Sequence, residues 1–240
     1  MKVAVINFSG NVGKTTIARH LLLPRIPGAG LIAIESINAG PGDGLSLRGK
    51  QFGALQEYLQ TVDSVVVDIG ASNVEDLLAL MRRYQRSHED FDYFVVPTVA
   101  ALKQQQDTIA TLTELSRLGV APSRLRIVFN MIEDDVQVTD AFEPLLKFVA
   151  QFPVVQASTR CALNANEIYA RLKGMPKESG TELAELARDT TDYKALIAKA
   201  ANIAEKQALA QALATRRLAC GVVPELDACF AALELEPVST

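Results

Sequence analysis

The residues with the clearest chemical potential lie near the amino terminus, in the segment MKVAVINFSGNVGKTT. A run of small residues leads into Lys14, Thr15 and Thr16. At a glycine turn before a helix, backbone N–H groups converge on an anion and the helix dipole adds positive potential. Lys14 is expected to reach the β- and γ-phosphates of a nucleotide, Thr15 to bind Mg²⁺ and Thr16 to bond the α-phosphate. The segment therefore predicts a phosphate-binding loop.

Two elements must position this loop. Val3 to Ile6 is an apolar, β-branched run typical of a buried strand, and an apolar helical pattern runs from about Gly13 to Leu23. The motif departs from G-x-x-x-x-G-K-[ST], because Phe8 stands where the first glycine is expected. A tight strand-to-helix turn with a lysine at the helix start is the alternative. The residues predicted to bind nucleotide in this loop are Gly10, Asn11, Val12, Gly13, Lys14, Thr15 and Thr16.

Two acids follow other predicted strands. The segment SVVVD is a buried strand that ends in Asp68, where a carboxylate can hold the shell of a magnesium ion, often through water. Asp68 could instead cap the helix that starts near Asn73. Glu35 follows the strand Leu31 to Ile34, ahead of a glycine-rich loop that is either a nucleotide-sensing switch or a plain connection.

A polar amide ends another predicted strand. Asn130 closes the run LRIVFN, and an asparagine amide offers one donor side and one acceptor to a purine edge. The alternative is a turn residue that begins the next loop. Ligands of parallel α/β sheets bind at the carboxyl ends of the strands, where Lys14, Glu35, Asp68 and Asn130 are all expected.

Alternating strands and helices predict an α/β fold with a doubly wound, mainly parallel sheet and a C-terminal helical extension. The nucleotide-binding domain is expected over residues 1–172, and the extension, packed on it or appended to it, over 181–240. KGMPKESG, before the extension, is the best candidate linker. Val154 and Val155 are expected to form the last strand. Gly221 and Pro224 are expected to separate a helix over 192–219 from a last helix over 226–235.

Composition narrows the function classes. Of 240 residues, 49% are hydrophobic, enough for a core, and the net charge of −4 argues against a basic surface along the whole chain. A local basic patch could still bind nucleic acid. Three scattered cysteines do not make a disulfide framework or a zinc site. No apolar run approaches the roughly 20 residues of a membrane span, and a core strand stands in place of a signal peptide, so a cytoplasmic location is expected.

These motifs resemble the ParA/MinD group of P-loop ATPases, which carry a deviant Walker A sequence, N-x-K-G-G-x-G-K-T-T. The resemblance covers roughly Met1 to Leu172. Asn7, Gly10 and the run Gly13 to Thr16 match that sequence. The resemblance implies that Asp68 is the Walker B acid and that Asn130 reads adenine, and FDYFVVPTVAALKQQQ is similar to the segment after switch II. Within the group the chain is most similar to plasmid-borne StbB-like proteins, tied to plasmid stability and conjugation.

Two positions depart from the family pattern. Ser9 stands where the family has a signature lysine that reaches across a nucleotide-sandwich dimer. The family has a D-x-D pair at the end of the switch I strand. Here the two positions hold Glu35 and Ile37, so the second acid is replaced by an apolar residue. We therefore expect ATP binding with slow hydrolysis, or hydrolysis that needs a partner group in trans.

The resemblance implies the following expectations. The cofactors are ATP and Mg²⁺, with Thr15 and Asp68 as metal ligands and Lys14, Glu35 and Asp68 as the catalytic set. The function is an ATP-binding role in plasmid stability, positioning or conjugative transfer. The partners are a second copy bound in the ATP state, a plasmid-encoded protein, and DNA through local or indirect contact. The acidic segment ELEPVST, which is not a basic amphipathic tail, argues against a membrane partner. A nucleotide-dependent adaptor and a metabolic P-loop kinase or ligase are the alternatives.

Overall fold

The computed structural model describes residues 1–34, 49–172 and 182–236. The described strands form one parallel sheet in the order β2-β3-β1-β4-β5-β6. Their bounds are β1 Lys2–Val5, β2 Gly30–Ile34, β3 Val65–Ile69, β4 Tyr93–Thr98, β5 Leu125–Ile132 and β6 Ala162–Asn164. The predicted α/β class with a parallel sheet and a C-terminal helical extension is confirmed.

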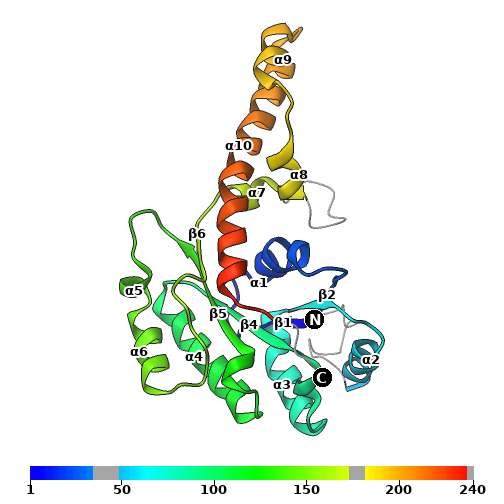
Figure 1. The fold of residues 1–240 in the computed structure, drawn as a ribbon, viewed down its shortest axis with the longest axis vertical. Helices are drawn as coiled ribbons and strands as arrows, with labels where there is room; N and C mark the ends of the chain where they lie inside the picture. The colour runs from blue at the N-terminus through cyan, green and yellow to red at the C-terminus, as the bar shows by residue number, and fades with distance from the viewer. Residues whose placement is uncertain (35–48, 173–181, 237–240) are drawn as a thin grey trace, which may run out of the picture.

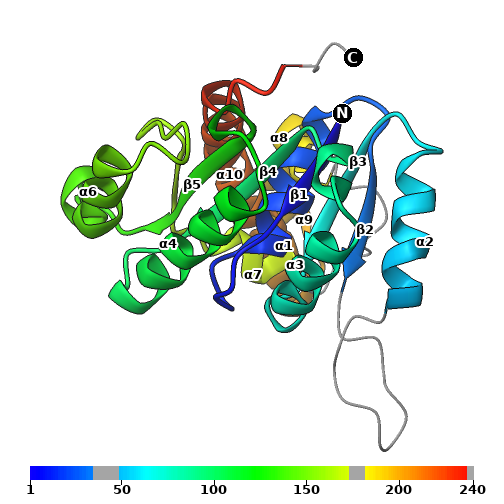
Figure 2. The same cartoon turned by 90° about the horizontal axis from the view of Figure 1, so that it is seen from below.

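Helices cover both faces of the sheet, as Figure 2 shows. One layer contains α2 Gly49–Leu59, α3 Val74–Arg83, α4 Leu102–Arg117, α5 Val138–Ala141 and α6 Glu143–Gln151. The other contains α1 Lys14–Thr16, the π-helix η1 Ile17–Leu22, α7 Ile168–Leu172, α8 Glu182–Arg188 and α10 Ile203–Ala232. Short 3₁₀ turns are η2 Leu23–Arg25, η3 Ala71–Asn73, η4 Ser87–Asp90 and η5 Pro122–Arg124. Because both faces are covered, the central strands are mostly apolar on both sides rather than alternating.

The sheet register brings the loop and the acid-ended strand together. β1 lies between β3 and β4, and Val5 pairs with Asp68 across the β1–β3 ladder. The segment after β1 therefore leaves the sheet beside the carboxyl end of β3. This is the edge at which ligands of parallel α/β sheets bind.

The helix after the loop differs from the one expected. Instead of a uniform α-helix from Gly13 to Leu23, α1 is short and passes directly into η1. Arg25 stabilises the end of this π-helix: its guanidinium donates to the carbonyls of His20 and Leu21 and forms an ion pair with Asp227 of α10. The long C-terminal helix is thus tied to the helix that follows the loop.

α10 corrects the expected division of the extension. The helix continues through Gly221 and Pro224 to Ala232, and the break lies before Ile203 instead. Val222 is buried against the sheet layer, and this packing outweighs the low helix propensity of its neighbours. The side chain of Asn202 caps the new start by accepting from the backbone N–H of Glu205. Figure 1 shows α9 (Tyr193–Lys199) beside the first half of α10, projecting away from the sheet.

The last strand also differs from the expectation. Val154 and Val155 lie outside any strand, and β6 is formed by Ala162–Asn164, paired with β5. Val155 is buried all the same, because its side chain joins the core from a loop. The apolar β-branched residues thus indicated burial correctly here, but they did not indicate a strand paired in the sheet.

A buried arginine anchors the end of the extension at the opposite edge of the sheet. Arg126 of β5 donates to the carbonyls of Leu233 and Glu234, and its guanidinium lies 5.1 Å from the centre of the Tyr93 ring. The Tyr93 hydroxyl in turn bonds the backbone of Glu236.

Within the described residues, no helix has both the length and the apolar character needed to cross a bilayer. The division of the chain at residues 172 and 181 stays a prediction.

Candidate nucleotide-binding site

The backbone between β1 and α1 turns through two residues in the left-handed region. Gly13 has φ +86°, in the left-handed region where glycine is favoured, and Asn11 has φ +56°. A Cβ atom on Gly13 would lie 2.2 Å from Nδ2 of Asn130. Gly13 is therefore required both by its dihedral angle and by the close approach of β5.

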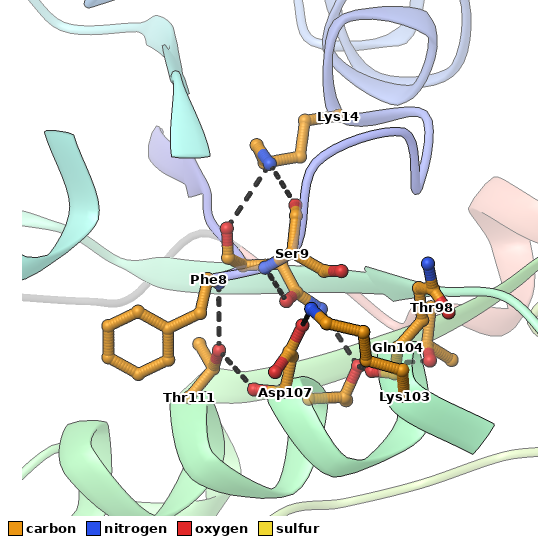
Figure 3. Close-up of polar contacts among 10 residues, drawn as sticks. Phe8, Ser9, Lys14, Thr98, Lys103, Gln104, Asp107 and Thr111 are labelled. Carbon is orange, nitrogen blue, oxygen red and sulfur yellow. Dashed lines mark hydrogen bonds and ion pairs between the residues drawn. The ribbon is translucent and has the colours of Figure 1, made fainter. Parts of the chain in front are cut away.

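Lys14 folds back over this loop. Its side chain is largely buried, and Nζ donates to the carbonyl of Ser9 at 2.6 Å and to that of Asn7 at 3.2 Å, as Figure 3 shows. Burial lowers the pKa of the Lys14 ammonium from 10.5 to about 8, although the carboxylate of Asp68 acts in the opposite direction. The lysine is thus held at the loop by groups that a phosphate oxygen can replace.

Thr15 and Asp68 face each other. The Thr15 hydroxyl donates to Oδ2 of Asp68 at 2.6 Å, from the start of α1 to β3. Both are oxygen ligands of the kind Mg²⁺ prefers, and magnesium at nucleotide sites usually takes one or two protein ligands, with phosphates and waters completing its shell. The described residues contain no cluster of three or more His, Cys, Asp or Glu side chains that could hold a metal without such help. The pair fits a magnesium ion carried in with a nucleotide.

Asn130 lies in β5 as expected, but the strand continues beyond it to Ile132. It is buried, and Nδ2 donates to the carbonyl of Val12 at 2.9 Å, so that β5 contacts the loop directly. The following residue, Met131, has φ +55° and an exposed side chain. The structure thus gives Asn130 a loop-supporting contact. Its expected part in reading adenine stays a prediction.

A buried polar network, missed at the sequence level, supports the loop from α4. Asn7 donates to the carbonyl of Pro97 at 2.9 Å and to the hydroxyl of Thr108 at 2.8 Å, while its own Oδ1 accepts from the N–H of Ser9 at 2.7 Å. The N–H of Phe8 donates to Thr111 at 3.1 Å. Two threonines three residues apart on one helix were the available signal, because such a pair lies on one helix face.

The remaining predicted residues divide into two groups. Gly10, Val12 and Thr16 lie with Lys14 and Thr15 along the loop and its helix start. Glu35, Ile37 and the glycine-rich loop fall outside the described residues. Of the expected catalytic set, the structure therefore places Lys14 and Asp68 at the carboxyl edge of the sheet.

Comparisons with known proteins found a likeness among solved structures. No family model matches the chain, and no curated protein sequence matches it. Among solved structures, the chain is similar to a single-residue variant of McdA from Cyanothece in complex with ATP. The identity is 16% and the TM-score 0.48, over 89% of this chain and 96% of that one.

Proposed function

We propose that this chain is a ParA-like P-loop protein that binds ATP·Mg²⁺ at the carboxyl edge of its sheet. The observation that carries the proposal is the contact between Thr15 and Asp68, 2.6 Å apart, beside Lys14. Lys14 offers a cation to the phosphates, and Thr15 and Asp68 offer two oxygens to the metal. They come together just after Gly13, which has a left-handed backbone conformation. These are the groups that P-loop nucleotide sites require.

In the proposed complex, Lys14 turns from the carbonyls of Ser9 and Asn7 to the β- and γ-phosphates. When bound, Mg²⁺ would supply charge neutralisation for the phosphates. Thr15 and Asp68 would hold it, and the backbone N–H groups of the loop would bind the phosphate oxygens. Asn130 keeps the loop in place through Val12 and offers its amide to adenine.

Hydrolysis is proposed to be slow. Ser9 is uncharged and largely buried, so it brings no cation to the γ-phosphate. Ile37 can neither orient nor deprotonate a water, and Glu35 is the acid that remains. Turnover by the isolated chain should fall well below the roughly 1–100 s⁻¹ of kinases, and a partner protein or DNA should accelerate it.

The biological role follows from the resemblance in the loop. We assign the chain to plasmid stability, positioning or conjugative transfer, acting in the cytoplasm with a plasmid-encoded partner and cycling between ATP and ADP states. An ATP-linked homodimer and local or indirect DNA contact belong to this proposal. A nucleotide-dependent adaptor with little hydrolysis is the second candidate, favoured by the absence of a cation at Ser9.

A phosphate-release assay with the purified chain tests this proposal, run alone, with DNA and with a lysate fraction from a plasmid-bearing cell. Slow basal phosphate release that rises when DNA or the lysate fraction is added supports the ATPase. ATP binding without stimulated phosphate release supports the adaptor. Rapid release by the isolated chain contradicts the proposal of slow turnover. Failure to bind ATP contradicts both candidates.

A further inference from the structure

The γ-phosphate end of the proposed site can be located from Lys14. In P-loops this lysine reaches the β- and γ-phosphates, and here its amine lies 2.6 Å from the carbonyl of Ser9. Ser9 therefore marks the terminal-phosphate end of the loop. Even with Mg²⁺ and Lys14 in place, ATP keeps net negative charge, so a further cation near Ser9 would favour the triphosphate over the diphosphate.

A second lysine is linked to that end of the loop. Asp107 of α4 accepts a hydrogen bond from Lys103, whose amine lies 3.0 Å from its carboxylate. Burial acts to raise the pKa of Asp107, but the hydrogen bond and charge of Lys103, with the nearby Ser9 hydroxyl, together lower it. Figure 3 shows Lys103 and Asp107 on α4 next to Ser9. Asp107 is thus ionised next to the place where a phosphate would arrive.

The position of Lys103 is unfavourable for the helix itself. It lies in the first turn of α4, which contains no acidic residue, and a cation there opposes the helix dipole. Its pairing with Asp107 also runs in the weaker order, with the lysine four residues before the acid. Residues that break local rules without benefit to the fold are often retained for function.

Lys103 is free to move to a new partner. Its side chain is 78% exposed, and an exposed ion pair within a helix contributes little to stability. A phosphate oxygen offers a stronger, charge-assisted hydrogen bond. Little therefore holds Lys103 on Asp107 once a triphosphate is bound.

We propose that Lys103 is a second phosphate-binding cation, which Asp107 holds beside Ser9 until the γ-phosphate of ATP takes its place. The inference rests on the proposed function and deepens it, because it assigns to α4 the preference for ATP over ADP. Lys103 then provides from α4 the positive charge that Ser9 does not provide from the loop.

The test compares the affinities for ATP and ADP, both with Mg²⁺, in the full chain and three variants. Lys103→Gln should weaken ATP binding about tenfold and leave ADP binding unchanged, since ADP has no γ-phosphate. Asp107→Asn should strengthen ATP binding relative to ADP binding, because it frees Lys103 and removes a negative charge close to the phosphates. Lys147→Gln is the matched control: Lys147 forms an exposed i,i+4 pair with Glu143 on α6, and its loss should change neither affinity.

The outcomes separate this inference from the proposed function. Wild-type chain that binds neither nucleotide refutes the proposed function, and this inference with it. Wild-type chain that binds ATP while Lys103→Gln leaves the ATP-to-ADP ratio unchanged refutes this inference alone. Equal weakening of both nucleotides by Lys103→Gln and Asp107→Asn also refutes it, because the pair would then only fix α4 against the loop.

Discussion

The hydroxyl of Thr15 and the carboxylate of Asp68 meet at 2.6 Å, although 53 residues separate them in the chain. The meeting follows from the sheet order, because β3 lies directly beside β1 and Val5 pairs with Asp68. A loop that starts after β1 and turns into α1 must therefore pass the end of β3. The contact makes the proposed metal site a consequence of topology rather than of one motif.

The first prediction concerns the metal. Asp68→Asn keeps the shape of the side chain but removes the charge that attracts Mg²⁺, so ATP affinity should lose most of its dependence on Mg²⁺ concentration. Titrations at low and saturating Mg²⁺ measure this. Thr15→Ser keeps the hydroxyl and serves as the control. An Asp68→Asn variant with wild-type Mg²⁺ dependence would remove Asp68 from the metal site.

The second prediction concerns pH. Burial holds the pKa of Lys14 near 8 in the free protein, and a bound phosphate should raise it by stabilising the ammonium form. Near and above pH 8, ATP binding should therefore take up a proton, and affinity should fall as pH rises through this range. Calorimetry in two buffers with different ionisation enthalpies measures the uptake. Lys14→Met should abolish it, whereas uptake that persists in this variant would assign the proton to another group.

The third prediction concerns the glycine of the loop. Gly13→Ala places a Cβ atom 2.2 Å from the amide of Asn130 at φ +86°, so either the loop or β5 must shift. We expect loss of nucleotide binding and a lower melting temperature. Gly221→Ala in α10 is the matched control, because it lies outside the loop, nothing lies within 4 Å of a Cβ there and its φ is not positive. Wild-type binding by Gly13→Ala would show that this loop geometry is not needed.

The fourth prediction separates two roles of Asn130. Asn130→Ala should lower ATP affinity, because the hydrogen bond from its side-chain amide to the Val12 carbonyl is lost. Leaving a buried polar group unpaired costs about 1–3 kcal/mol. If Asn130 also reads adenine, discrimination against GTP should weaken as well. Parallel titrations with ATP and GTP decide this. Equal losses for both nucleotides would leave Asn130 with the loop-supporting role alone.

Much of the sheet and loop could be predicted because local signals agree there. The apolar runs of β1, β3, β4 and β5 are largely buried strands bounded by turns, and alternation with helices predicts a parallel sheet. The chemistry-bearing residues Lys14, Thr15 and Asp68 then follow from where these strands end. Here local preference and tertiary packing favour the same structure.

The rest depends on tertiary contacts that local signals do not contain. Pro224 and Gly221 indicate a break, yet α10 passes through them because its apolar face is buried on the sheet layer. Val154 and Val155 look like a strand but pack from a loop. The support of the loop by Asn7 and Thr108 joins residues 101 positions apart, so the threonine pair on α4 marks a polar helix face but not the loop residue that it contacts.

The central claim is that Lys14, Thr15 and Asp68 form one site for ATP·Mg²⁺. Calorimetric titration of ATP with Mg²⁺ into the wild-type chain and into Lys14→Ala tests it most directly. We expect saturable binding by the wild type and affinity at least about tenfold weaker, or about 1.4 kcal/mol, in the variant. Absence of saturable binding by the wild type, or equal affinity in the two proteins, would contradict it.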